Sequence, residues 1–118
     1  MSRFKLKLTD DELRVVGSSC LYAVRRKGKV GHIATIALLE TCEHLWGRMR
    51  NMYRPDRESY TIRLSAEEVQ ALTQEVLPHI IGYDEPYLRA IGSTLKEDLE
   101  KQVEREMSVY NSMRYGVE

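Results

Sequence analysis

Two short stretches of the chain alternate between apolar side chains and charged or hydroxyl-bearing ones. The apolar positions are Phe4, Leu6 and Leu8 in the first stretch and Tyr60, Ile62 and Leu64 in the second, and the positions between or beside them are Arg3, Lys5, Lys7, Thr61 and Arg63. A period of two is typical of a strand that buries one face. The pattern therefore predicts strands over residues 3–8 and 59–64, each with a polar, largely cationic face in water.

Each predicted strand runs into the signature of a helix start. Thr9 precedes Glu12 by three residues, and Ser65 precedes Glu68 by the same spacing. In such a capping box the hydroxyl accepts a hydrogen bond from a free helix N–H, and the Glu carboxylate accepts one from the N–H of the cap residue. The two stretches starting at residues 4 and 60 agree in residue class at ten of thirteen positions. Internal duplication is one interpretation of this likeness, and two independent strand-to-helix junctions are the other.

Over the rest of the chain, apolar positions recur every three or four residues, which is the period of an amphipathic helix. We expect helices over residues 10–26 and 32–53, a third helix after Ser65, and a long fourth helix over residues 86–113. The order is strand, helix, helix, strand, helix, helix. The sequence therefore predicts a mainly α (α+β) fold of four helices with a small two-stranded β-ribbon, and 118 residues suit one domain over 1–118.

Two residues argue for interruptions in the later helices. Pro78 lacks the N–H that a continuing helix needs, so we expect the third helix to stop or kink near Leu77. Gly92 interrupts the apolar stripe of the fourth helix, which predicts a break near Ser93 as an alternative to one continuous helix.

The net charge is zero, but the charges divide unevenly along the chain. Residues 1–57 hold 12 Lys and Arg against 6 Asp and Glu, and residues 58–118 hold 6 against 12. Such asymmetry marks either a binding face or two complementary halves that pack together. We favour packing, because a domain of this size has no room to keep its halves apart.

Composition also indicates where the protein resides. Cys20 and Cys42 fall on predicted helical stripes as free thiols, which is typical of a reducing compartment. The N-terminus is charged from Arg3 onward, and no apolar run approaches the roughly 20 residues that span a bilayer. We expect a soluble, cytoplasmic protein without membrane contact.

The outward face of the predicted ribbon suggests nucleic-acid binding. It would present Arg3, Lys5, Lys7, Thr61 and Arg63, and a two-stranded ribbon fits the DNA major groove, where Lys and Arg reach guanine. The strand-helix-helix order is similar in topology to ribbon-helix-helix DNA-binding proteins, with both half-units on one chain. The first helix is longer than that family's pattern, and the second half of the chain is acidic. The alternative is that Lys and Arg on an exposed ribbon face only discourage aggregation.

The sequence carries no pattern for catalysis, a cofactor or a metal. Gly17-Ser-Ser-Cys20 lies in mid-helix, not at the strand-to-helix turn of a nucleophile elbow. Glu40 and His44 share a helical face, but a metal site needs three or four converging ligands. We therefore expect a protein that is not an enzyme, with no cofactor, no metal and no small-molecule ligand.

The remaining functional signal is a concentration of the residue types that interfaces enrich, namely Trp, Tyr, Met and Arg. The candidate interface residues are Trp46, Met49, Met52 and Tyr53 at the end of the second helix and Val103, Met107 and Tyr110 on the last. A straight 25-residue helix spans about 37 Å, which is near or beyond the diameter of a domain this size. Our first hypothesis is a non-enzymatic protein-interaction module that forms a homodimer, and the alternative is a DNA-binding regulator. These residues could equally fill the domain's own core.

Overall fold

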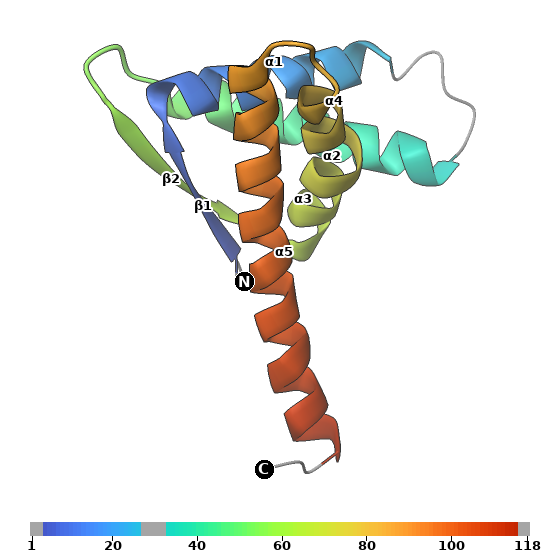
Figure 1. Cartoon of the computed structure of the whole chain (residues 1–118). Coiled ribbons are helices and arrows are strands. Elements are labelled where there is room, and N and C mark those ends of the chain that lie inside the picture. The colour runs from blue at the N-terminus through green and yellow to red at the C-terminus, as the bar shows by residue number, and fades with distance from the viewer. Residues whose placement is uncertain (1–3, 27–32, 116–118) are drawn as a thin grey trace.

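The computed structural model describes residues 4–26 and 33–115. The elements are β1 (Phe4–Thr9), α1 (Asp10–Arg25), α2 (Ile33–Met52), β2 (Ser59–Leu64), α3 (Ala66–Ala71), a π-helical segment (Leu72–Val76), α4 (Leu77–Ile81) and α5 (Pro86–Tyr115). The path from α3 to α4 is one continuous helix. The described part of the chain therefore has four helices and a two-stranded sheet, which confirms the predicted fold class and order (Figure 1). Arg3 and the predicted helix start at His32 lie outside the described residues.

The two strands pair side by side and antiparallel, as the alternation predicts. Lys5 lies opposite Arg63, and Leu6 opposite Ile62. The apolar side chains of both strands are buried and the residues between them are exposed. The polarity pattern of the sequence is therefore the burial pattern of the ribbon.

Both predicted capping boxes are formed. The Oγ1 of Thr9 accepts a hydrogen bond from the N–H of Glu12 at 3.2 Å, and the Glu12 carboxylate accepts one from the N–H of Thr9 at 2.8 Å. The corresponding distances in the box of Ser65 and Glu68 are 3.2 and 2.9 Å. Because the strands are antiparallel, α1 and α3 leave from opposite ends of the ribbon.

The helices cover the apolar face of the ribbon and enclose one core. Its largest fully buried side chains include Leu6, Leu39, Leu45, Ile62, Leu64, Leu72, Leu77, Ile80 and Leu99. Two ion pairs join the basic half of the chain to the acidic half: Arg26 with Glu75 at 3.0 Å and Arg48 with Glu68 at 2.6 Å. Such pairs are what complementary packing of the two halves predicts.

Of the stop or kink predicted near Leu77, the stop is wrong, because the helical path continues through α4 to Ile81, and the helix is irregular directly before Leu77. Before Pro78 the helix widens into the π-helical segment, where the N–H of Leu77 bonds to the carbonyl of Leu72. A proline ring normally clashes with the carbonyl four residues earlier, and a wider turn shifts that carbonyl. The proline is thus accommodated by an irregular turn that precedes it.

Of the two alternatives for the last helix, a break near Ser93 or one continuous helix, the structure has the continuous helix, since α5 runs without interruption. Gly92 is buried where α5 packs against α4. A Cβ at this position would lie 2.9 Å from Cγ1 of Ile81 and 3.0 Å from Cγ2 of Ile80. The glycine therefore permits a close approach of two helices and does not end one.

The close approach predicts the effect of adding one methyl group. Gly92→Ala should lower the free energy of unfolding by about 1–3 kcal/mol, because overpacking outweighs the gain in helix propensity. Gly47→Ala is the matched control: a Cβ there meets nothing within 4 Å, so it should be neutral or stabilise by about 0.5–1 kcal/mol. Urea unfolding of both variants measures the difference. A Gly92→Ala variant as stable as the parent would contradict the tight contact.

Candidate functional site

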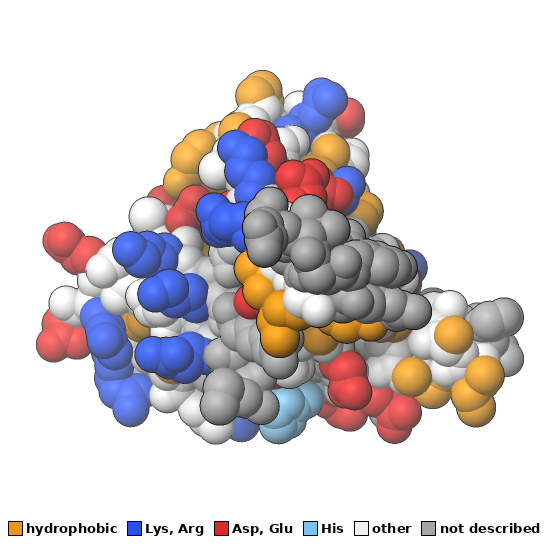
Figure 2. Space-filling model, turned by 90° about the horizontal axis from the view of Figure 1, so that it is seen from below, with side chains coloured by type: hydrophobic (Ala, Val, Ile, Leu, Met, Phe, Trp, Pro, Cys, Tyr) orange, Lys and Arg blue, Asp and Glu red, His pale blue; other side chains and the backbone are white. Residues whose placement is uncertain are grey.

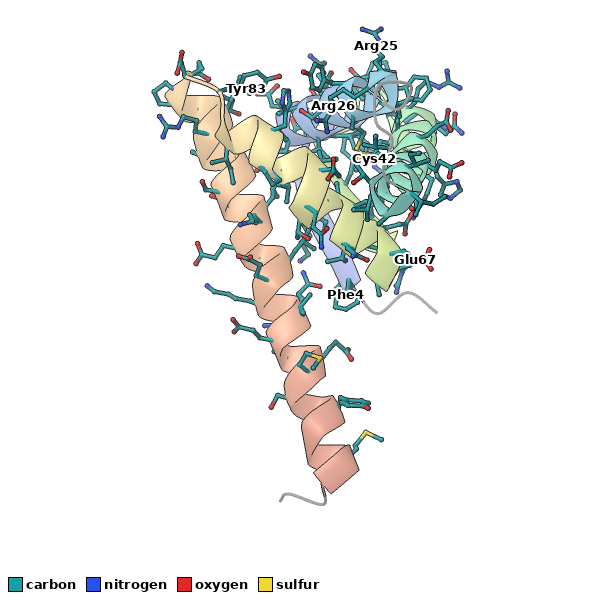
Figure 3. The ribbon with its side chains drawn as sticks, turned by 90° about the vertical axis from the view of Figure 1, so that its right-hand side faces the viewer. Phe4, Arg25, Arg26, Cys42, Glu67 and Tyr83 are labelled. Carbon is teal, nitrogen blue, oxygen red and sulfur yellow. The ribbon has the colours of Figure 1, made fainter. Side chains whose placement is uncertain are left out.

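The apolar stripe of α5 passes from the core into solvent. Leu95 and Leu99 are 4% and 0% exposed, but Val103, Met107 and Tyr110 are 37%, 53% and 52% exposed. We call residues 103–115 the α5 tail. Figure 1 and the quarter-turned view in Figure 3 both show it standing clear of the other elements. Three of the seven predicted interface residues therefore lie on a projecting helix.

The candidate residues on α2 lie differently. Met49 is 2% exposed and belongs to the domain's own core, while Trp46, Met52 and Tyr53 are half-buried and pack against that core. Met49 therefore follows the alternative prediction, in which these residues fill the core of the domain. The other three present only part of their surface to a partner.

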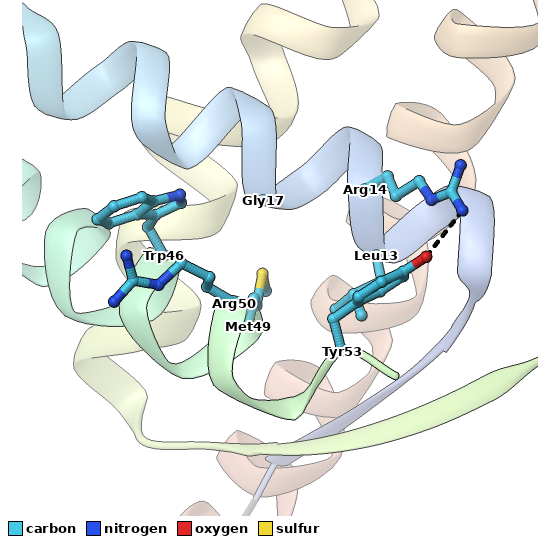
Figure 4. A pocket seen from close by; sticks show the side chains of 7 residues that line it. All are labelled: Leu13, Arg14, Gly17, Trp46, Met49, Arg50 and Tyr53. Atoms are coloured by element: carbon cyan, nitrogen blue, oxygen red, sulfur yellow. Dashed lines mark hydrogen bonds between the residues drawn. The ribbon is translucent and has the colours of Figure 1, made fainter. Parts of the chain in front are cut away.

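Trp46 and Tyr53 form part of a groove between α1 and α2, with a cavity of about 380 Å³. Its lining comprises Leu13, Arg14, Gly17, Trp46, Met49, Arg50 and Tyr53 (Figure 4). Arg14 donates a hydrogen bond to the hydroxyl of Tyr53 at 2.9 Å, and the guanidinium of Arg50 lies 4.9 Å from the centre of the Trp46 ring. The groove thus has an apolar floor and a cation near each aromatic wall.

The outward face of the ribbon presents the predicted cationic residues. Lys5, Lys7, Thr61 and Arg63 are all exposed, whereas Arg3 lies outside the described residues. In Figure 2, Lys and Arg side chains gather on the side where Figure 1 places the ribbon. We call this surface the ribbon face.

Helix α5 limits the ribbon face along β1. Asp98, Gln102, Arg105 and Glu106 of α5 line a shallow hollow together with Lys5 and Lys7. Two of these four side chains are acidic and one is basic, so α5 offsets part of the positive charge on β1. The cationic character is therefore least opposed along β2.

The two thiols lie inside the molecule as free cysteines. Burial raises the pKa of Cys42 to about 11 and raises that of Cys20 well above its ordinary value. Figure 3 shows Cys42 among the packed helices. Among the described residues, no three His, Cys, Asp or Glu side chains are grouped to hold a metal ion. Both cysteines are core residues. Because only the thiolate is nucleophilic, their raised pKa values make them poor nucleophiles.

Comparison with protein-family models, curated proteins and solved structures finds no match. In the described part of the chain, every helix is too short or too polar to cross a membrane.

Sequence reasoning missed the residues that depend on tertiary contacts. Arg14, Gly17 and Arg50 enter the groove only because α1 packs on α2. Gln102 bonds to the backbone of Lys5 across 97 positions in sequence. A small residue such as Gly17 on an otherwise apolar helix face was the one local signal available for the groove.

The raised pKa values predict slow thiol chemistry in the native protein. At pH 8, a disulfide reagent should label Cys20 and Cys42 far more slowly in the folded protein than in urea, because the folded thiols stay protonated. Stability should fall as pH rises above about 8.5, where the unfolded thiols lose protons that the folded ones keep. Absorbance of the released thiolate measures the labelling rate, and fast labelling of the native protein would contradict the placement of both thiols.

Proposed function

We propose that this protein is a non-enzymatic interaction module that self-associates as a homodimer, with the α5 tail at the contact. One observation carries the proposal. The stripe that is buried up to Leu99 continues at the same helical spacing through Val103, Met107 and Tyr110, where each residue is more than a third exposed. A second copy would cover this continuation of the stripe.

The energetics of an isolated helix support a partner. A helix of about a dozen residues without tertiary packing is marginal in water, and the α5 tail extends roughly 20 Å beyond its last core contacts. Burying each large apolar side chain contributes about 1.5–3 kcal/mol. Covering Val103, Met107 and Tyr110 would therefore stabilise both the helix and the association.

Trp46, Met52 and Tyr53 expose part of their surface elsewhere on the domain, away from the α5 tail. We propose them as a second contact area, since aromatic and Met side chains are enriched at interfaces. We assign the module to the cytoplasm, because Cys20 and Cys42 remain free thiols in the fold and a reducing compartment keeps them so.

The proposal is tested by placing a charge on the stripe. Met107→Asp should shift the protein from dimer to monomer and raise the dimer dissociation constant at least about tenfold, because the interface would bury an unpaired carboxylate. Ser108→Asp is the matched control, since Ser108 is exposed and lies off the apolar stripe, about 100° around the helix from Met107. Light scattering over a range of concentrations reports the mass. A parent protein that stays monomeric at every concentration would refute self-association.

A second candidate function is DNA binding by the ribbon face. The antiparallel pairing places Lys5, Lys7, Thr61 and Arg63 together on one exposed surface, and such a ribbon fits the major groove. The acidic residues of α5 beside β1 oppose this function, which is why we rank it second.

The DNA hypothesis predicts a charge-specific loss of binding. Replacing Lys5, Lys7 and Arg63 by Gln should abolish the shift of a DNA duplex in a native gel at low salt, because each lost phosphate contact weakens binding. Each lost contact should also reduce the slope of log binding constant against log salt concentration by about one. Replacing the exposed or half-exposed Arg89, Lys96 and Lys101 by Gln removes the same charge elsewhere and should leave the shift unchanged. Equal loss in both variants would exclude the ribbon face as the binding surface.

A further inference from the structure

The outer edge of β2 borders a second groove, which shares Met52 with the proposed dimer contact and Thr61 and Arg63 with the ribbon face. Arg48, Asn51 and Met52 of α2 line it on one side, and Thr61, Ile62 and Arg63 of β2 on the other. Its volume is about 520 Å³. We call it the β2-edge groove. A groove between an edge strand and a helix is the shape in which extended peptides bind as an added strand.

The hydrogen bonds show which backbone groups face this groove. In an antiparallel pair, residues alternate between those that bond to the partner strand and those that point away. The backbone N–H and C=O of Lys5 both bond to the side chain of Gln102, so these two backbone groups point away from β2. Arg63 lies opposite Lys5 in the register, so its backbone N–H and C=O point away from β1. Its carbonyl accepts a hydrogen bond from the Arg48 guanidinium at 2.7 Å.

The same alternation places Thr61 on the open edge. Lys7 lies opposite Thr61, two residues along from the pair of Lys5 and Arg63. The N–H and C=O of Thr61 therefore point into the β2-edge groove, and no hydrogen bond to another described residue occupies them. The N–H of Arg63 faces the same way. These donors and acceptors form the row that strand addition requires.

The two edges of the ribbon differ in their protection. On the β1 edge, the Gln102 amide binds both backbone groups of Lys5, at 3.1 and 2.8 Å, in the way that a neighbouring strand would. On the β2 edge, the carbonyl of Arg63 accepts a hydrogen bond from Arg48, and no other described residue occupies an outward backbone group of Thr61 or Arg63. The β2 edge is therefore the one that is open to an incoming strand.

The charges around the groove specify its occupant. An added strand would place alternate side chains beside Thr61 and Arg63 on the ribbon face, and the others toward Met52 and Ile62. The guanidinium of Arg48 is already paired with Glu68, whereas Arg63 extends the cationic face. Opposite charges on neighbouring strands stabilise pairing, and like charges oppose it.

We propose that the β2-edge groove binds an extended peptide segment of a partner protein by strand addition, with acidic side chains on the ribbon face and apolar side chains toward Met52. A second copy of this chain fits less well. Pairing β2 with β2 would join two ribbon faces, each carrying Lys5, Lys7 and Arg63, into one sheet of like charge. The groove does not include the α5 tail, and no test variant changes Met52, the residue that the two proposals share, so either can fail alone.

The test uses a synthetic peptide as probe: acetyl-Glu-Val-Glu-Val-Glu-Val-Glu-amide, carrying a fluorophore on a terminal linker. Fluorescence anisotropy should show it binding the full-length protein. Two peptides serve as controls, one with Lys in place of every Glu and one with N-methylated backbone amides at the second and third Glu, the residues that would lie opposite Thr61 and Arg63 in an antiparallel pair. Each should bind at least about tenfold more weakly, because the first reverses the charge and the second loses ladder hydrogen bonds.

Protein variants locate the site. Thr61→Pro removes the outward N–H and should weaken binding at least about tenfold, while Thr61→Val keeps that N–H and should change the affinity by less than about twofold. Arg63→Glu leaves the backbone intact and should reverse the preference between the Glu and Lys peptides. It keeps the proposal testable if the proline variant does not fold.

Amide hydrogen exchange gives the direct readout. Saturating peptide should slow exchange at the Thr61 N–H and leave the Lys7 N–H, on the opposite edge, unchanged. Three outcomes would overturn the proposal. They are absence of binding, binding that survives both Thr61→Pro and Arg63→Glu, and protection of Thr61 that appears without peptide as the protein concentration rises, which would identify a second copy as the occupant.

Discussion

Pairing between β1 and β2 is the constraint on which the other parts of the structure depend. An isolated two-stranded ribbon is marginal in water, so it must bury one face against other elements. Here the buried face carries Leu6, Ile62 and Leu64, and the helices that cover it belong to both halves of the chain. Because the strands are antiparallel and each ends in a capping box, the ribbon also fixes where α1 and α3 begin. Strand pairing thus sets the direction of two helices.

The elements that could be predicted are those whose cause is local. Alternation located both strands, and the hydroxyl–Glu spacing at Thr9 and Ser65 located two helix starts to the residue. Local rules were incomplete at Pro78 and Gly92: the helix is irregular before Pro78 but does not stop there, and the break considered near Gly92 does not occur. At both positions tertiary packing decided the outcome. Continuing the helix past Pro78 keeps Leu77 and Ile80 in the core. The lack of a side chain at Gly92 lets α5 approach α4 closely. The likeness of the two strand-to-helix units remains compatible with duplication and with simple repetition of a junction.

For the candidate surfaces, periodicity identified the apolar stripe of α5. It did not show where the other elements stop burying that stripe, which is between Leu99 and Val103. Leu99 and Val103 occupy equivalent positions on the helix, and only the packed body distinguishes the first from the second. The same limit applies to α2, where Met49 and Trp46 look alike as interface candidates although one is core. Hydrophobic spacing reports the direction of a side chain on its own helix, and exposure depends on what other elements reach it.

Helix α5 carries one proposed association surface, the α5 tail, and covers the β1 edge of the ribbon, opposite the proposed β2-edge groove. Its side chain at Gln102 closes the β1 edge, immediately before the α5 tail begins at Val103. A partner that orders the tail would also hold this part of α5 in place, because a helix propagates order along its own hydrogen bonds. Self-association would then keep the β1 edge closed and confine strand addition to Thr61 on the β2 edge. Because Gln102 covers the β1 edge, the two proposed contacts would not compete for the same edge of the ribbon.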